Sequence, residues 1–277
     1  MSGLFEGVKS SVPVVLSLAI TWFLTYIISG GPPPPAPAIT PIPEPAGDSG
    51  QALYAPAPYL NTLIVLTTLV AGGVIMVYLL HHHRALKVFA ASLTAAASFS
   101  VTSYFLLLAS PLDGLFVFTI SGLAALAVLY SIFKRGGVPS VLASAYVGAS
   151  AGSVMGISIP YWTAIIVLIG VSAYDIVAVS IGPLKVLGSD KVGRIPGLMV
   201  DFGGISLGMG DLFFYSVAQS FSIYHWGPQA GLMSTTGLVI GFLTTVYLAG
   251  KRRIIAGLPL PLTLSLALGY LAGSLLQ

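Results

Sequence analysis

Charged residues are scarce in this sequence, and cysteine is absent. Of the 277 residues, 7% are charged and 56% are hydrophobic, and the mean hydropathy is +0.97. An average soluble domain carries about 25% charged residues, so this chain has too few charges to cover a soluble surface. The composition excludes a soluble globular enzyme and a disordered chain, and it indicates a protein that crosses a bilayer several times.

The absence of cysteine excludes a disulfide, a zinc–thiolate site, an iron–sulfur cluster and a thiol nucleophile. The net charge of +3 would suit nucleic acid, but basic residues in a membrane protein usually mark cytoplasmic loops, so we expect no nucleic-acid binding. His81, His82 and His83 could bind a metal ion. Adjacent histidines lack a fixed ligand geometry, however, and we interpret them as a solvated turn. We expect neither a metal nor a cofactor.

Apolar runs of about 20 residues predict the transmembrane helices, because that length crosses a hydrocarbon core about 30 Å thick. We find nine such spans: Val12–Ser29, Tyr59–Leu80, Val88–Ala109, Gly114–Phe133, Val138–Ile157, Tyr161–Ile181, Gly204–His225, Gln229–Ala249 and Gly257–Leu276. We therefore expect an all-α membrane protein with a single polytopic domain, residues 1–277. Its parts are spans 1–6 within 1–181, a proline-rich loop at 30–58, a second long loop at 182–203, and spans 7–9 within 204–277.

The basic residues fix the orientation of these spans. All 11 fall on one side of the predicted arrangement: Lys9, Arg84, Lys87, Lys134, Arg135, Lys185, Lys191, Arg194, Lys251, Arg252 and Arg253. By the positive-inside rule that side is cytoplasmic, so we expect the N-terminus in the cytoplasm and the C-terminus outside. The proline-rich loop is then external and extended or disordered. We interpret it as a spacer, with a recognition role as the alternative.

Two acidic residues lie inside the predicted spans, Asp175 in span 6 and Asp211 in span 7. An aspartate at the centre of a membrane helix costs about 2.5–3.5 kcal/mol on insertion scales, so each is a candidate functional residue. Asp175 precedes the cytoplasmic end of its span by six residues, and Asp211 follows the start of its own by seven. At 1.5 Å per residue both acids lie about 9–11 Å from that face, so antiparallel neighbouring helices would bring them level.

Two facing carboxyl groups can share one proton, because burial and repulsion disfavour two charges. One acid can then polarise a carbonyl while the other takes a proton from an attacking water, which hydrolyses a peptide without a metal. Two alternatives stay open at this point. Asp175 and Asp211 could form the ion site of a proton-coupled transporter, or they could join helices in a non-catalytic membrane scaffold.

Three short motifs are more specific than the acids alone. Span 6 contains Tyr174-Asp175, span 7 contains Gly208-Met209-Gly210-Asp211, and span 9 begins with Gly257-Leu258-Pro259-Leu260-Pro261. Their order and placement resemble the presenilin and signal peptide peptidase family of intramembrane aspartyl proteases. The third resembles the Pro-Ala-Leu motif of that family, with Leu260 between the prolines in place of alanine.

The resemblance implies an intramembrane-cleaving aspartic endopeptidase with Asp175 and Asp211 as the catalytic pair. It also implies that Pro259, Leu260 and Pro261 lie beside the pair and help to hold substrate. The residue types suggest further roles: Gly208 and Gly210 would allow close approach or backbone freedom next to Asp211. Tyr174 would hydrogen-bond near the pair or simply pack. The two prolines, which cannot donate backbone hydrogen bonds, would keep the start of span 9 from being regular helix, or mark a simple span boundary.

A stripe of Gly208, Asp211, Tyr215 and Ser222 on span 7, with Gln219 nearby, would either line a wet cavity or bond to neighbouring helices. The expected substrates are transmembrane helices, which must unwind and could then add as a strand to exposed backbone near the site. The expected orientation resembles presenilin and favours type I substrates, with the N-terminus outside. We expect a multi-pass protein of the cell membrane, with its site toward the cytoplasm and no obligatory partner subunit.

Overall fold

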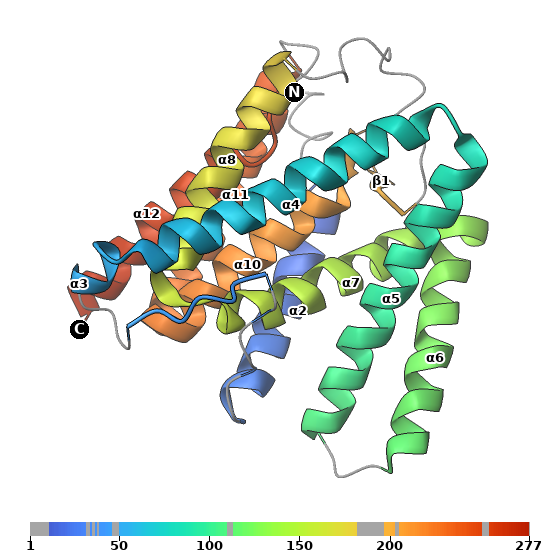
Figure 1. Cartoon of the computed structure of the whole chain (residues 1–277), viewed down its shortest axis with the longest axis horizontal. Coiled ribbons are helices and arrows are strands. Elements are labelled where there is room, and N and C mark those ends of the chain that lie inside the picture. The colour runs from blue at the N-terminus through green and yellow to red at the C-terminus, as the bar shows by residue number, and fades with distance from the viewer. Residues whose placement is uncertain are drawn as a thin grey trace.

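The computed structural model describes residues 11–31, 34, 37, 39–45, 50–109, 113–181, 197–202, 205–250 and 255–276. Nine long helices dominate this part of the chain (Figure 1). They are α2 (Val12–Ser29), α4 (Pro56–Leu80), α5 (His83–Ala109), α6 (Gly114–Tyr130), α7 (Gly137–Ser158), α8 (Tyr161–Ile181), α10 (Met209–Trp226), α11 (Pro228–Ala249) and α12 (Pro259–Leu276). Smaller elements are helix α3 (Gly50–Leu53), the π-helix η1 (Ser131–Arg135) and strands β1 (Met199–Phe202) and β2 (Ile205–Gly208).

Seven of the described helices are long and apolar enough to cross a bilayer: α2, α4, α5, α6 continued by η1, α7, α8 and α11. Helix α12 is apolar but shorter by this measure, and α10 is too polar to qualify. The helical membrane class is therefore confirmed, and seven of the nine predicted spans coincide with such helices. The full count of nine and the orientation stay predictions, because much of their support lies outside the described residues: Lys9, Lys185, Lys191, Arg194, Lys251, Arg252 and Arg253.

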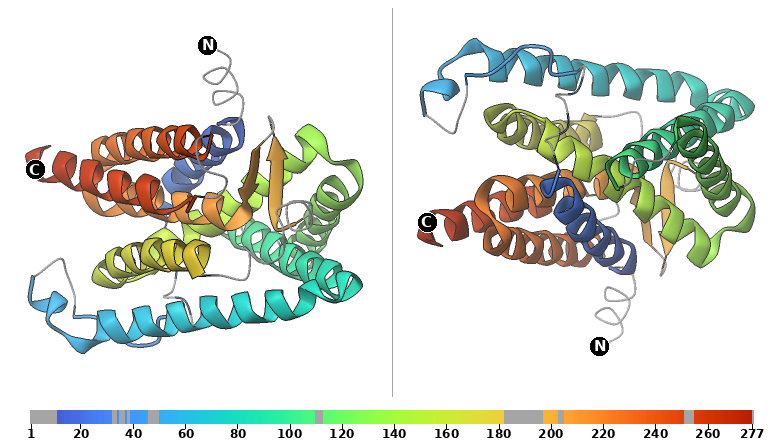
Figure 2. Two further views of the ribbon diagram at one scale, coloured as in Figure 1. Left: turned by 90° about the horizontal axis from the view of Figure 1, so that it is seen from above. Right: turned by 90° about the horizontal axis from the view of Figure 1, so that it is seen from below.

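Helix α10 lies at the centre of the bundle and contacts α2, α7, α8, α11 and α12. Nearly all of its residues from Leu212 to Ser222 are buried, which explains how a helix with several polar side chains belongs in the core. Helices α5 and α6 form a hairpin at one side, and α4 runs along the outside of the bundle against α8 (Figure 2). The carboxyl group of Asp211 is therefore carried by a helix of the bundle core.

A row of glycines on α7 lets α10 approach closely. A Cβ atom added at Gly152 would lie 2.5 Å from Ser216 Cβ and 2.6 Å from Phe213 O. One added at Gly148 would lie 3.1 Å from Leu212 Cβ. Glycines four residues apart form one face of a helix, and in membranes such faces bring helix backbones into contact. This face sets the position of α10, and with it the position of Asp211.

The start of predicted span 7 is wrong. Residues 205–208 form β2 instead of helix, β2 pairs antiparallel with β1, and α10 begins only at Met209. Alternate residues share a face in this hairpin: Val200 and Leu207 are buried, whereas Asp201 and Ser206 are exposed. A short apolar run does not distinguish strand from helix, and the long helix after it concealed the boundary. Most of the loop expected at 182–203 lies outside the described residues.

The proline-rich segment is docked on the bundle at Ile42 and Glu44, and its interpretation as a spacer stays a prediction. The side chain of Asn61 on α4 accepts a hydrogen bond from Ile42 N at 3.1 Å and donates one to Ile42 O at 2.8 Å. The Glu44 carboxylate accepts hydrogen bonds from the backbone N–H groups of Trp162 (3.1 Å) and Thr163 (2.8 Å) and from the Thr163 hydroxyl. The segment thus joins the starts of α4 and α8.

We expect Glu44→Ala to lower the free energy of unfolding by about 1 kcal/mol, because Glu44 caps the first N–H groups of α8 and its charge suits a helix N-terminus. Asp113→Ala is the matched control. Asp113 is an acidic residue at the N-terminus of α6, but its side chain makes no capping hydrogen bond. Thermal unfolding in detergent measures both variants, and equal shifts would contradict the capping role.

Candidate active site

The two predicted catalytic residues come from adjacent helices of the core. Asp175 lies on α8, six residues before that helix ends, and Asp211 lies in the first turn of α10. Both side chains are partly buried. A carboxylate in the first turn of a helix is favoured by the helix dipole and by the unpaired N–H groups there. The short hairpin before α10 therefore gives Asp211 a position that an unbroken helix would not.

The two carboxyl groups both lie close to the Gly257–Leu258 segment before α12. Leu258 N donates a hydrogen bond to Asp175 Oδ2 at 2.9 Å. A Cβ atom added at Gly257 would lie 3.0 Å from Asp211 Oδ2. Both carboxyl groups therefore approach the same short segment, Gly257–Leu258, just before α12.

Tyr215 fixes this peptide from the side of α10. Its hydroxyl donates a hydrogen bond to Gly257 O at 2.8 Å, and its side chain is fully buried on the same helix as Asp211. Asp175 of α8 thus binds the N–H of Leu258, and Tyr215 of α10 binds the carbonyl of Gly257. A fixed link of this kind pre-organises the separation of the two acids.

The glycines around Asp211 differ in their surroundings. A Cβ atom added at Gly208 would lie 3.4 Å from Asp211 Oδ2, in van der Waals contact, whereas one added at Gly210 would meet no atom within 4 Å. Gly208 and Gly257 thus leave the carboxyl group of Asp211 without a neighbouring side chain on two sides. Gly210 borders open space.

The prolines of the third motif belong to regular helix, which corrects one expectation. Helix α12 begins at Pro259 itself, and Leu262 N donates to Leu258 O at 3.0 Å in its first turn. Proline is tolerated there because the first N–H groups of a helix have no intrahelical partner. Pro261 is buried, and a Cβ atom added at Gly241 of α11 would lie 2.5 Å from Pro261 Cα. Close packing of α11 on α12 therefore positions the motif beside the acids.

Tyr174 points toward another helix. A Cβ atom added at Gly73 of α4 would lie 3.1 Å from the Tyr174 hydroxyl, so this side chain reaches the contact between α8 and α4. Its neighbour in sequence, Asp175, meets Leu258 instead. Neighbouring positions on a helix point in different directions, which accounts for the separation.

The polar stripe on α10 ends, toward the C-terminus of the helix, in Gln219 and Ser222. In the orientation that satisfies its amide, Gln219 accepts hydrogen bonds from Thr235 Oγ1 (2.8 Å) and Trp22 Nε1 (2.7 Å) and donates to Leu18 O (3.2 Å). Ser222 donates to Ala218 O at 2.9 Å within α10. Both side chains are fully buried. Of the two interpretations of this stripe, bonding between helices is the one observed at Gln219, whereas Ser222 bonds within its own helix.

Sequence reasoning missed the Gly257–Leu258 peptide as the link between the acids, because a backbone N–H carries no signature in sequence. It also missed the row of Gly148, Gly152 and Gly156, which a search for glycines at four-residue spacing would have found. His81 and His82 are exposed at the turn between α4 and α5. Among the described residues no group of three or more His, Asp or Glu side chains could hold a metal ion.

Comparisons with known proteins bear on this geometry. Two solved structures of a presenilin family intramembrane aspartate protease superpose on the chain. The first, in space group C222, has a TM-score of 0.67 and 17% identity and covers 99% of this chain and 100% of its own. The second, in space group P2, has a TM-score of 0.64 and 20% identity and covers 96% of each. The chain has the presenilin-family fold.

The sequence comparisons extend this fold assignment. Presenilin-B of Dictyostelium discoideum is 32% identical over 131 residues. That match takes in 43% of this chain and 27% of Presenilin-B, so the chain matches about a quarter of the curated relative. No protein-family profile matches the chain. The resemblance to the presenilin family that the three motifs predict is confirmed, and within the presenilin-family fold Asp175, Asp211 and Leu258 meet at one place.

Proposed function

We propose that the protein is an intramembrane aspartyl endopeptidase that hydrolyses peptide bonds within transmembrane segments of other membrane proteins. One observation carries the proposal: Asp175 and Asp211, from two different helices, both approach the Gly257–Leu258 segment inside a helical membrane fold. Two carboxyl groups from different helices at one point suit acid–base chemistry on a shared substrate. Asp175 and Asp211 act as the catalytic pair.

Hydrolysis proceeds through one water molecule shared by the pair. The ionised carboxyl group takes a proton from water as the oxygen attacks the scissile carbonyl, and the protonated carboxyl group polarises that carbonyl. The proton later passes to the leaving nitrogen, which restores the starting state of the pair. The open sides of Asp211 at Gly208 and Gly257 leave room for water and for a substrate backbone. The peptide at Leu258 holds Asp175 in place during these steps.

The substrate binds as an extended strand on the outer edge of β2. Strand β1 contacts α7 and α2, and β2 leads directly into α10. Met209 N donates to Leu198 O at 2.9 Å, and bonded pairs alternate along an antiparallel ladder. The amide and carbonyl groups of β2 that point away from β1 are therefore those of Ser206 and Gly208. An unwound substrate segment pairs with them and passes Asp211.

We expect Ser206→Pro to lower kcat/KM about fivefold, because one backbone hydrogen bond contributes roughly 1 kcal/mol net. Ser206→Ala is the control, since it removes the hydroxyl bond to Asp201 but keeps the backbone N–H. Steady-state cleavage of one peptide substrate measures both variants. If Ser206→Ala loses as much activity as Ser206→Pro, the strand-addition proposal is wrong.

The charge pattern and the fold support several further features of this function. The active site lies toward the cytoplasmic side of the cell membrane, and the substrates are type I proteins with the N-terminus outside. Pro259 and Leu260, which are partly buried at the start of α12, contact the substrate, whereas Pro261 is buried against α11. Gly208 and Gly210 support the site next to Asp211, and Tyr174 supports it from a distance, through the contact of α8 with α4. The chain acts without an obligatory partner subunit.

The test uses purified protein in liposomes with a single-span peptide, whose fragments are identified by mass spectrometry. We expect cuts inside the apolar segment with the wild type, and none with Asp175→Ala or Asp211→Ala. A peptide left intact by the wild type across several lipids and pH values would overturn the protease proposal. Proton uptake coupled to solute movement in the same liposomes would instead favour the alternative, a proton-coupled transporter.

A further inference from the structure

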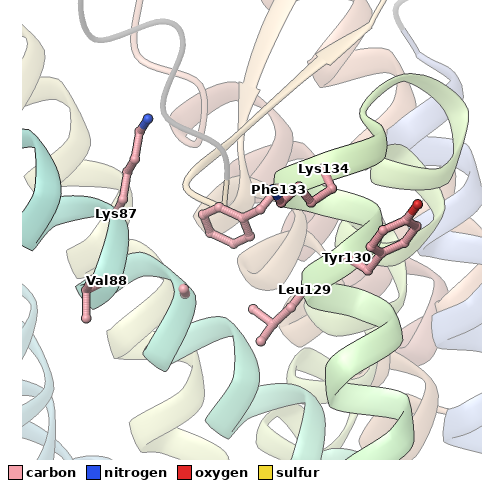
Figure 3. Close-up of a pocket in the computed structure, with 7 residues that line it drawn as sticks. Lys87, Val88, Leu129, Tyr130, Phe133 and Lys134 are labelled. Carbon is pink, nitrogen blue, oxygen red and sulfur yellow. The ribbon is translucent and has the colours of Figure 1, made fainter.

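A cleft between α5 and the end of α6 lies apart from the active site. Its volume is about 380 Å³, within the range of about 300–1,000 Å³ typical of ligand pockets. Val88 and Ala91 of α5 form one wall, and Leu129 of α6 and Phe133 of η1 form the other. Figure 3 shows Leu129 and Phe133 extending from one helix toward the other across this gap.

Charge is confined to one end of the cleft. Lys87 lies one turn before Ala91 on α5, and Lys134 lies just past Phe133 in η1, at the end of the second wall. Both lysines are exposed, and no described carboxylate lines the cleft. Helices α5 and α6 run antiparallel, so the first turns of one meet the last turns of the other. The two lysines therefore lie at one end of the cleft. The apolar residues follow them along the helices, and each helical turn adds about 5 Å to the apolar length.

We propose that this cleft binds one anionic phospholipid, with the phosphate between Lys87 and Lys134 and an acyl chain along Val88, Ala91 and Leu129. Along the helices, the two lysines come first and the apolar residues follow. A phospholipid has the same arrangement, because its charged headgroup lies at the membrane surface and its acyl chains lie in the hydrocarbon core. A partner helix would match the apolar walls but would leave two cations without a counter-charge. The lysines on both walls select an anionic headgroup over a zwitterionic one.

Phe133 connects the cleft to the hairpin before α10. A Cβ atom added at Gly197 would lie 2.8 Å from Phe133 Cζ, and Gly197 precedes β1 by two residues. Phe133 and Met209 also pack against the same buried apolar cluster, which includes Val147, and Met209 lies two residues before Asp211. An acyl chain in the cleft restrains Phe133 and, through it, the hairpin and the start of α10. Anionic lipid thereby promotes cleavage, a consequence that rests on the proposed function.

Lipid retention tests the site without any need for activity. Purified protein in detergent is titrated with phosphatidylglycerol or phosphatidylcholine, and bound lipid is counted by native mass spectrometry. A lysine at a membrane surface contributes about fivefold to the affinity for anionic lipid. We therefore expect Lys87→Gln with Lys134→Gln to weaken binding of one phosphatidylglycerol by more than tenfold.

The matched control is Arg84→Gln with Arg135→Gln, which removes the same charge from α5 and η1 at residues that do not line the cleft. We expect the affinity of this double variant for phosphatidylglycerol to stay within about threefold of the wild-type affinity. Ala91→Phe, which fills the slot and keeps both lysines, should abolish retention. Equal weakening by the lysine and arginine pairs, or equal retention of the two lipids by the wild type, overturns the proposed site.

Cleavage rates in liposomes of the two lipids test the connection to the active site. We expect phosphatidylglycerol to raise the rate for the wild type and for the arginine pair, but not for the lysine pair. If the lysine pair loses the bound lipid but still cleaves as fast as the wild type in phosphatidylglycerol, the connection through Phe133 is wrong. A protein that retains the lipid but never cleaves would count against the proposed protease and not against the lipid site, because the two readouts are independent.

Discussion

Asp175→Asn and Asp211→Asn should each lower peptide cleavage by about 10³-fold or more. Asparagine has nearly the same shape as aspartate, but it can neither take a proton from water nor give one to a carbonyl at neutral pH. A positioned acid or base raises the reaction rate by about 10² to 10⁴. Here the two carboxyl groups act on one water molecule and one carbonyl, so the loss of either disables the action of both. Single-turnover cleavage of one single-span peptide, with fragments counted by mass spectrometry, measures the effect.

These variants should fold normally, which separates chemistry from stability. In Asp175→Asn the new side chain can still accept the hydrogen bond from Leu258 N through its amide oxygen, so the link between α8 and α12 survives. We expect free energies of unfolding within about 1 kcal/mol of the wild type. Asp113→Asn, at the exposed start of α6, is the matched control and should leave cleavage unchanged. A variant that loses activity only because it unfolds would say nothing about the acids.

Gly152→Leu should lower cleavage by about 10²-fold without touching the acids. Even a Cβ atom at Gly152 would lie 2.6 Å from Phe213 O, a backbone atom that can move only with α10 itself. A larger side chain therefore displaces α10, and a shift of about 1 Å at a catalytic group can cost about 10²-fold in rate. Overpacking of this kind also costs about 1–3 kcal/mol in the free energy of unfolding.

Gly122→Leu provides the matched control for this change. Gly122 lies in the interior of α6, and a Cβ atom there would meet no atom within 4 Å. We expect cleavage within about twofold of the wild type and unchanged or slightly higher stability, since leucine favours helix over glycine. Equal losses at Gly122 and Gly152 would contradict the role of the α7 glycine face in positioning Asp211.

Much of the site was predictable because it rests on composition and spacing. The scarcity of charge made Asp175 and Asp211 conspicuous, and the apolar runs gave spans that largely coincide with the observed helices. The motif at Pro259 placed a third element near the acids. Each of these features depends on which residue types stand where, and sequence reports that directly.

The parts that could not be predicted depend on backbone atoms and on packing between distant helices. The hydrogen bond from Leu258 N to Asp175 uses an amide that every residue but proline carries. Strand β2 is too short and too close to α10 to reveal its period, so it read as helix. The docking of Glu44 on α8 joins residues more than 100 positions apart, and only the fold brings them together.

The most direct test of the central claim compares three variants, Asp175→Asn, Asp211→Asn and the double substitution, in one cleavage assay. If the two carboxyl groups act as one unit on one water molecule, removing either removes the whole of their effect. We expect all three variants to cleave at the same background rate. A double variant that is slower than either single by the product of their separate losses would contradict the account, as would substantial cleavage by either single variant.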